Sequence, residues 1–173
     1  MVRGIVTSIL ILGVISCAKK TPEVKIKTVE GSRVAFIGEM GDYSKVGSVI
    51  EELYIWLGER EVLIAGPCFG VYYDDPEKVP ADSLRWEICV PVEAELEGDE
   101  RVGIKDIPET EVAYLIHKGS YETVGSDWKK LYGWIFRNNY TPTGPGREVY
   151  LNNPKEVPED SLLTEIQVPV EKK

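Results

Sequence analysis

The chain has 173 residues, of which 43% are hydrophobic and 28% are charged, which suits one ordinary globular core rather than two large domains. Its net charge of -9 argues against a nucleic-acid partner, because neutralising phosphates needs a basic surface. The chain has one histidine, His117, and its three cysteines are Cys17, Cys68 and Cys89. These are too few soft ligands for a histidine-rich or all-cysteine zinc site, so we expect no metal ion and no cofactor.

Residues 1–17 have the pattern of a bacterial lipoprotein signal. Arg3 precedes an apolar run of about twelve residues, which is too short for a membrane-spanning helix but suits a secretory signal. The run ends in Val-Ile-Ser-Cys17, which resembles a lipobox, whose cysteine is acylated and becomes the first mature residue. We therefore expect a signal peptide over 1–16, a tether over 17–23, and an exported lipoprotein anchored to a membrane of the bacterial cell envelope. A plain secretory signal or an uncleaved anchor is the alternative.

An internal repeat organises the rest of the chain. The segment VPADSLRWEICVPVE at 79–93 matches VPEDSLLTEIQVPVE at 157–171, an offset of 78 residues. Aligning 24–93 with 102–171 at this offset needs no gap and gives 29 identities in 70 positions. We interpret the repeat as a tandem duplication whose acidic linker is 94–101. Each copy is too small to bury a full core easily, so we expect the two to pair about a pseudo-two-fold axis.

Each copy has the pattern of a strand, a helix and two further strands. In the first copy, β-rich runs over 24–29 and 33–40 precede the helix, and strands through 71–73 and 84–92 follow it. Apolar side chains at helical spacing mark the two helices: Val46, Val49, Ile50, Leu53 and Leu57, then Val124, Trp128, Leu131 and Ile135. The sequence predicts an α+β domain over 24–171, with an antiparallel sheet and two helices packed on one of its faces.

Three segments resemble one known family. KGSYETVGSDWKKLYGW at 118–134, EVYLNNP at 148–154 and LTEIQVPV at 163–170 are similar to the GyrI-like, or bacterial effector-binding, domain. The resemblance implies a duplicated strand-helix-strand-strand unit with a pocket for small, often cationic and aromatic-rich molecules. Members of the family are fused to DNA-binding regulators, are linked to gyrase inhibition, or hydrolyse cyclopropane-bearing toxins. We do not expect the first two activities here, because no helix-turn-helix accompanies the domain and export would separate it from gyrase.

Side-chain alternation along the strands selects candidate pocket residues. In the last strand, Glu165 faces away from the apolar side chains that meet the helices. A hairpin with Tyr73 opposite Leu84 would put Tyr72 beside Glu87, and the same register would put Tyr150 beside Glu165. It would also put Cys68 opposite Cys89; whether they form a disulfide is left open.

The resemblance points to the same residues. It implies that Glu165 is the pocket glutamate and Tyr150 a pocket aromatic, whereas the position of Glu87 is less regularly glutamate in the family. A carboxylate among aromatic rings would stabilise an organic cation by charge and by cation-π attraction. A strand glutamate on a solvated face is the simpler alternative for both acids.

Other aromatic and polar residues have less specific interpretations. Phe36 and Tyr114 could line the pocket or belong to the core. The helical spacing of the repeated aromatics Tyr54, Trp56, Tyr132 and Trp134 favours core packing. His117 has no carboxylate at a fixed spacing, so we expect it at the surface.

These observations favour a membrane-tethered, non-enzymatic protein that captures small hydrophobic compounds, which we expect to be cationic, between the two repeats. The alternative is a hydrolase that detoxifies strained-ring (cyclopropanoid) electrophiles, with Glu165 as base or nucleophile. Catalytic motifs such as G-x-S-x-G, H-E-x-x-H and the P-loop are absent from the sequence. An envelope scaffold whose pocket has closed is a third interpretation.

Overall fold

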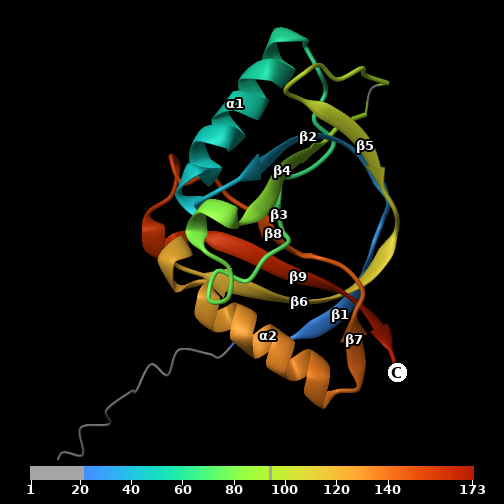
Figure 1. Cartoon of the computed structure of the whole chain (residues 1–173), viewed down its shortest axis with the longest axis vertical. Coiled ribbons are helices and arrows are strands. Elements are labelled where there is room, and N and C mark those ends of the chain that lie inside the picture. Colours follow the sequence, from blue (N-terminus) through green and yellow to red (C-terminus); the bar gives the residue numbers. More distant parts are fainter. Residues whose placement is uncertain (1–21, 94) are drawn as a thin grey trace, which may run out of the picture.

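A computed structural model describes residues 22–93 and 95–173 (Figure 1). The first half contains β1 (Lys25–Val29), β2 (Ser32–Met40), α1 (Val46–Glu59), β3 (Phe69–Tyr72) and β4 (Arg85–Pro91). The second half contains β5 (Gly103–Ile107), β6 (Thr110–Lys118), α2 (Gly125–Arg137), β7 (Tyr140–Pro142), β8 (Gly146–Tyr150) and β9 (Leu163–Lys172). Short 3-10 turns are η1 (Tyr43–Lys45), η2 (Ala81–Ser83), η3 (Tyr121–Thr123) and η4 (Glu159–Ser161). The expected signal peptide and Cys17 lie outside the described residues and stay predictions.

The strands form one antiparallel sheet in the order β1-β6-β9-β8-β3-β4-β2-β5, and β7 pairs with the end of β9. The two halves meet at β3 and β8 in the middle, and each half lends its first strand to the other, because β1 pairs with β6 and β5 with β2. The expected α+β fold with an antiparallel sheet is confirmed. The duplication and its symmetry stay predictions from the sequence.

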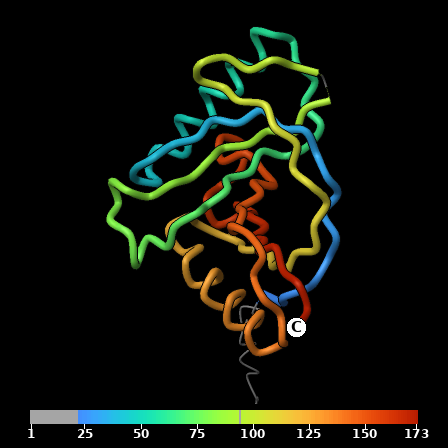
Figure 2. The backbone as a smooth tube through the Cα atoms, turned by 45° about the vertical axis from the view of Figure 1, so that its right-hand side comes forward, coloured from blue at the N-terminus to red at the C-terminus, as the bar shows by residue number. Residues whose placement is uncertain are grey.

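The sheet curls until its two edges approach each other. The β1–β2 and β5–β6 segments run side by side in both views (Figures 1 and 2). A Cβ atom on Gly31, between β1 and β2, would lie 3.1 Å from the carbonyl oxygen of Ile107 and the backbone nitrogen of Glu109. Glycine therefore permits this approach. One face of the sheet lies inside the curl.

Both helices pack on the other face. Helix α1 contacts β2 and β4, and α2 contacts β6, β7 and β9. Leu53 of α1 and Leu131 of α2 are fully buried, and burying each such side chain stabilises the fold by roughly 1.5–3 kcal/mol. Asp42 and Ser120 each accept a hydrogen bond from the backbone two residues on and so cap the 3-10 turns that lead into the helices.

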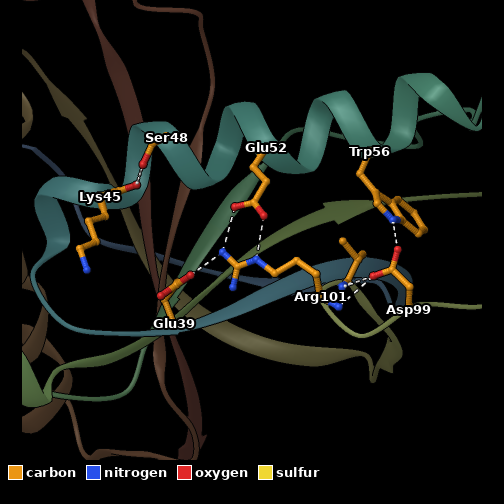
Figure 3. A network of polar contacts seen from close by, with 8 residues as sticks. Glu39, Lys45, Ser48, Glu52, Trp56, Asp99 and Arg101 are labelled. Carbon is orange, nitrogen blue, oxygen red and sulfur yellow. Dashed lines mark hydrogen bonds and ion pairs between the residues drawn. The ribbon is translucent and has the colours of Figure 1, made fainter.

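The linker between the halves is tied to α1 (Figure 3). The Arg101 guanidinium donates to both carboxylate oxygens of Glu52, at 2.7 and 2.9 Å, and also binds Glu39. The indole of Trp56 donates to Asp99 at 2.5 Å. This hydrogen bond, together with backbone donors, lowers the pKa of Asp99 to about 2. These contacts hold the start of β5 beside the first half.

The register of the β3–β4 pair differs by one residue from the sequence prediction. Phe69, not Cys68, lies opposite Cys89, and Tyr72 lies opposite Trp86. A one-residue shift turns every side chain of a strand to the other face of the sheet. As a result Cys68 belongs to the core under α1, whereas Cys89 lies inside the curl, and both are free thiols.

We predict that Cys68 and Cys89 remain unalkylated in the native protein and react fully once it is unfolded in urea. Burial raises the pKa of each thiol to about 12, so almost no thiolate is present at pH 8. Mass spectrometry of the two cysteine peptides after iodoacetamide treatment, without reduction, measures this. A peptide pair joined by a disulfide would contradict the observed register.

Candidate functional site

The two glutamates singled out in the sequence lie inside the curl, and each already has a lysine partner. Glu165 accepts hydrogen bonds from Lys27 at 2.6 Å and from the Gln167 amide at 2.5 Å. Glu87 forms an ion pair with Lys105. In each case the lysine stands on an edge strand that comes from the other half of the chain. The negative charge of both carboxylates is therefore balanced within the protein.

Phe36 and Tyr114 complete these two arrangements. The ammonium group of Lys105 lies 4.2 Å from the ring centroid of Phe36, and that of Lys27 lies 4.6 Å from the ring centroid of Tyr114. Both aromatic residues therefore face the inside of the curl. The combination of cation, carboxylate and ring that was expected for a bound ligand is made here by the chain's own lysines.

Tyr72 and Tyr150 lie on the helix side of the sheet, which corrects the predicted pairing with Glu87 and Glu165. Tyr150 is opposite Thr164, and it is Val149 that lies opposite Glu165. The physical reason is the one-residue shift in the register of both hairpins. This shift turns Tyr72 and Tyr150 to the helix side of the sheet. Their hydroxyl groups are 2.7 Å apart, so one donates a hydrogen bond to the other at the junction of the two halves.

Two further tyrosines cover this pair. Tyr43 of η1 packs edge-on against Tyr72 with ring centroids 5.0 Å apart, and Tyr121 of η3 packs edge-on against Tyr150 at 5.9 Å. Tyr121 is 37% exposed, so the cluster reaches the surface beside the start of α2. We call Tyr43, Tyr72, Tyr121 and Tyr150 the tyrosine cluster.

Glu148 is the acidic residue of the tyrosine cluster, and the sequence analysis missed it. Its side chain is on the helix side, only 8% exposed, and accepts a hydrogen bond from the Trp128 indole at 2.6 Å. Burial raises the pKa of Glu148, although the hydrogen bond from Trp128 and the electrostatic influence of His117 act in the opposite direction. Within residues 22–93 and 95–173 no lysine or arginine forms an ion pair with it. Glu148 is thus a buried acid without a basic partner of the kind that Glu87 and Glu165 have.

Two glycines make room for this arrangement. Gly70 lies directly opposite Glu148, and a Cβ atom there would be 2.8 Å from the Tyr72 hydroxyl oxygen. A Cβ atom on Gly146 would overlap the Trp128 ring. At the 78-residue offset, Glu148 in the second copy aligns with Gly70 in the first copy. This difference between the copies was the sequence signal that could have identified Glu148.

His117 is buried rather than at the surface, which corrects the sequence prediction. Its Nδ1 atom lies 2.8 Å from a carboxylate oxygen of Asp127, which also accepts a hydrogen bond from Lys130 at 2.6 Å. Its Nε2 atom lies 3.0 Å from the carbonyl oxygen of Ser120. The partner was missed because it stands on α2, ten residues along the chain. His117 thereby links β6 to the turn that carries Tyr121.

The aromatic residues expected in the core divide between core and surface. Trp56 is buried, and Tyr132 and Trp134 are partly buried against the core under α2, whereas Tyr54 is exposed.

In the described part of the chain no three His, Cys, Asp or Glu side chains gather as a metal ion would need. Nor does any helix in that part have the length and apolar character to cross a membrane.

We predict that Glu148→Gln raises the free energy of unfolding at pH 7 by about 1 kcal/mol, because a buried carboxylate without a lysine or arginine partner is costly. Since the folded-state pKa of Glu148 lies above its ordinary value, the wild type pays no ionisation cost below about pH 4. The difference in the free energy of unfolding between variant and wild type should therefore grow as pH rises from 4 towards neutrality. His117, Trp128 and Tyr72 surround the group in both proteins.

Urea unfolding at several pH values measures this difference. A variant that is less stable than wild type at pH 7 would mean that the Glu148 carboxylate is compensated in the folded protein.

Comparison with known proteins gives one family and one fold. The sequence profile of the GyrI-like small molecule binding domain matches residues 22–171. A DNA gyrase inhibitor from Citrobacter koseri is 26% identical over 157 residues, covering 87% of this chain and 99% of the relative. The EcmrR protein in an EcmrR–DNA complex has a TM-score of 0.81 at 22% identity, and the match covers 88% of this chain and 58% of EcmrR. SAV2435, solved with bound tetraphenylphosphonium, has a TM-score of 0.60 at 12% identity, covering 86% of this chain and 94% of SAV2435.

Proposed function

Because the chain belongs to the GyrI-like small molecule binding domain family, we propose that it binds a hydrophobic organic cation at the tyrosine cluster, with Glu148 as the counter-charge. The observation that carries the proposal is the contrast between three acids. Lys27 and Lys105 balance Glu165 and Glu87, whereas Glu148 is buried among aromatic rings without a lysine or arginine partner in the described residues. A cation bound beside Glu148 would offset the cost of burying its charge.

The rings around Glu148 suit a cation in a second way. Tyrosine and tryptophan faces attract cations by ~0.5–2 kcal/mol each when desolvated. Burial raises the pKa of Tyr72 and Tyr150 well above the ordinary value, so both hydroxyls stay neutral and add no competing negative charge. SAV2435, which shares the fold, binds the aromatic cation tetraphenylphosphonium, and this supports testing the same ligand class here.

Ligand access would require Tyr121 and Tyr43 to move, because Tyr72 and Tyr150 are packed beneath them. Both covering residues stand on 3-10 turns, and the Tyr43 hydroxyl is held by the carbonyl oxygen of Asp74 at 2.8 Å. Tyr121 is the more exposed of the two and is the residue we expect to swing outward. The closed-scaffold interpretation predicts instead that this cluster never opens.

The hydrolase alternative depends on Glu165 as base or nucleophile. Both Lys27 and Gln167 donate hydrogen bonds to one of its oxygens, which reduces the reactivity of the carboxylate toward a strained ring. Binding without reaction is therefore the function that we favour.

We predict that tetraphenylphosphonium binds the wild type with micromolar affinity, about -8 kcal/mol. Glu148→Gln should weaken binding at least tenfold, because the amide keeps the shape of the carboxylate but not its charge. Glu165→Gln is the matched control and should change affinity less than twofold. Isothermal titration calorimetry, with quenching of tryptophan fluorescence as a second readout, measures all three proteins.

Two other outcomes of this titration would contradict the proposal. A loss confined to Glu165→Gln would return the site to the inside of the curl, as the sequence resemblance implied. No binding by the wild type would remove hydrophobic cations as the ligand class and favour the closed scaffold.

We also propose that the domain is tethered to the cell envelope through an acylated Cys17. The support is the lipobox-like sequence before Cys17, which follows an apolar run of secretory length. Cys17→Ser should abolish labelling with a fatty-acid analogue and release the protein from the membrane fraction. Equal labelling and fractionation of variant and parent would exclude the lipid anchor.

A further inference from the structure

A pocket of about 670 Å³ lies inside the curl, on the face of the sheet opposite Glu148. The β1–β2 segment, the loop before β3, and strands β8 and β9 form its walls. Its apolar lining includes Pro67, Phe69, Pro91 and Val149. The volume is within the range of small-molecule sites. Nothing in the proposed function uses this pocket.

The charged lining of the pocket is mainly basic. The lining includes three basic residues, Lys27, Arg33 and Arg147, and two acidic residues, Glu30 and Glu165. Lys27 and Glu165 neutralise each other at 2.6 Å, and the Glu30 side chain is exposed to solvent. The positive charge of Arg33 and Arg147 in the pocket lining is therefore not balanced by a buried acid of the lining. This local excess of positive charge contrasts with the net charge of the chain, which is -9.

Neither arginine finds a hydrogen-bond acceptor for its buried nitrogen. The Nε atoms of Arg33 and Arg147 are both buried without a partner among the described residues, and neither side chain has an ion pair there. A buried donor without a partner destabilises the protein, and the cost is larger when the group is charged. Burial also lowers the pKa of Arg147, which reflects the cost of removing its guanidinium from water. An acceptor from outside the chain would satisfy both groups.

Arg147 also has an apolar neighbour suited to an amphipathic ligand. Its guanidinium carbon lies 5.9 Å from the ring centroid of Phe69, which forms a small core inside the curl with Val34, Val71 and Cys89. Val149, two residues along β8, lies on the same face and lines the pocket. A charged group and an apolar surface thus adjoin within one cavity.

We propose that this pocket binds a small amphipathic organic anion, whose carboxylate, sulfonate or phosphate accepts hydrogen bonds from Arg147 and Arg33. Guanidinium groups match the geometry of such oxyanions and form charge-assisted hydrogen bonds with them. The apolar part of the ligand lies against Phe69 and Val149. The chain then carries two sites of opposite charge preference on the two faces of one sheet.

The test compares an anionic probe with its neutral counterpart on the full chain. The probes are 8-anilino-1-naphthalenesulfonate and N-phenyl-1-naphthylamine, which share the same rings and differ by the sulfonate. Arg147→Gln should weaken binding of the sulfonate at least tenfold and change binding of the amine less than twofold. Arg137→Gln, at an exposed position on α2, is the matched control and should change neither. Fluorescence titration gives the affinities, and circular dichroism checks folding.

The opposite results are equally definite. Absence of saturable sulfonate binding to the wild type, or equal affinity of wild type and Arg147→Gln, would overturn the proposal. If Arg147→Gln fails to fold, Arg33→Gln is titrated in its place and the same tenfold loss is required.

A further variant separates this proposal from the proposed function. Glu148→Gln should leave sulfonate affinity unchanged, and a loss there would move the anion to the other face and overturn the inference. Failure of tetraphenylphosphonium to bind, with sulfonate binding intact, would reject the proposed cation site alone.

Discussion

The antiparallel pairing of β3 with β8 is the constraint on which both candidate sites depend. It sets Gly70 opposite Glu148 and Val71 opposite Arg147, and it brings the hydroxyls of Tyr72 and Tyr150 to 2.7 Å. Because successive side chains of a strand point to opposite faces of the sheet, the adjacent residues Arg147 and Glu148 lie on different faces. Glu148 joins the aromatic cluster beneath the helices, and Arg147 joins the cavity inside the curl. One pair of strands thus separates a negative site from a positive one.

The curl of the sheet decides which acids keep an unbalanced charge. Edge strands β1 and β5 each pair with the opposite half, and so carry Lys27 to Glu165 and Lys105 to Glu87. Such partly buried ion pairs contribute little net stability, because desolvation opposes the attraction, but removing one partner leaves a costly charge. Their consequence for function is that the inside of the curl has no spare carboxylate at these two positions. Glu148 lies beyond the reach of either lysine, on the far side of the sheet.

The sequence predicted the elements well, but it placed the registers of both hairpins, β3–β4 and β8–β9, wrong by one residue. Apolar spacing identified both helices, because a helix must place Leu53 and Leu131 on its buried side whatever its partner is. The hairpin between β3 and β4 was misplaced by one residue because Tyr72 and Tyr73 are adjacent aromatics, so alternation does not choose which one faces the core. The long Asp- and Pro-rich connection gives no turn type that would set the register.

The sequence by itself determined the α+β class, the antiparallel sheet, the two helices and the family, since these follow from local periodicity and from motifs read along the chain. It also suggested a carboxylate among aromatic rings. Only the tertiary structure shows which carboxylates are balanced by a lysine of the chain. Glu165 and its partner Lys27 are 138 residues apart, and their contact exists because the chain closes β1 onto β6 beside β9. Charge balance inside a protein is a property of such long-range neighbours, and no local pattern encodes it.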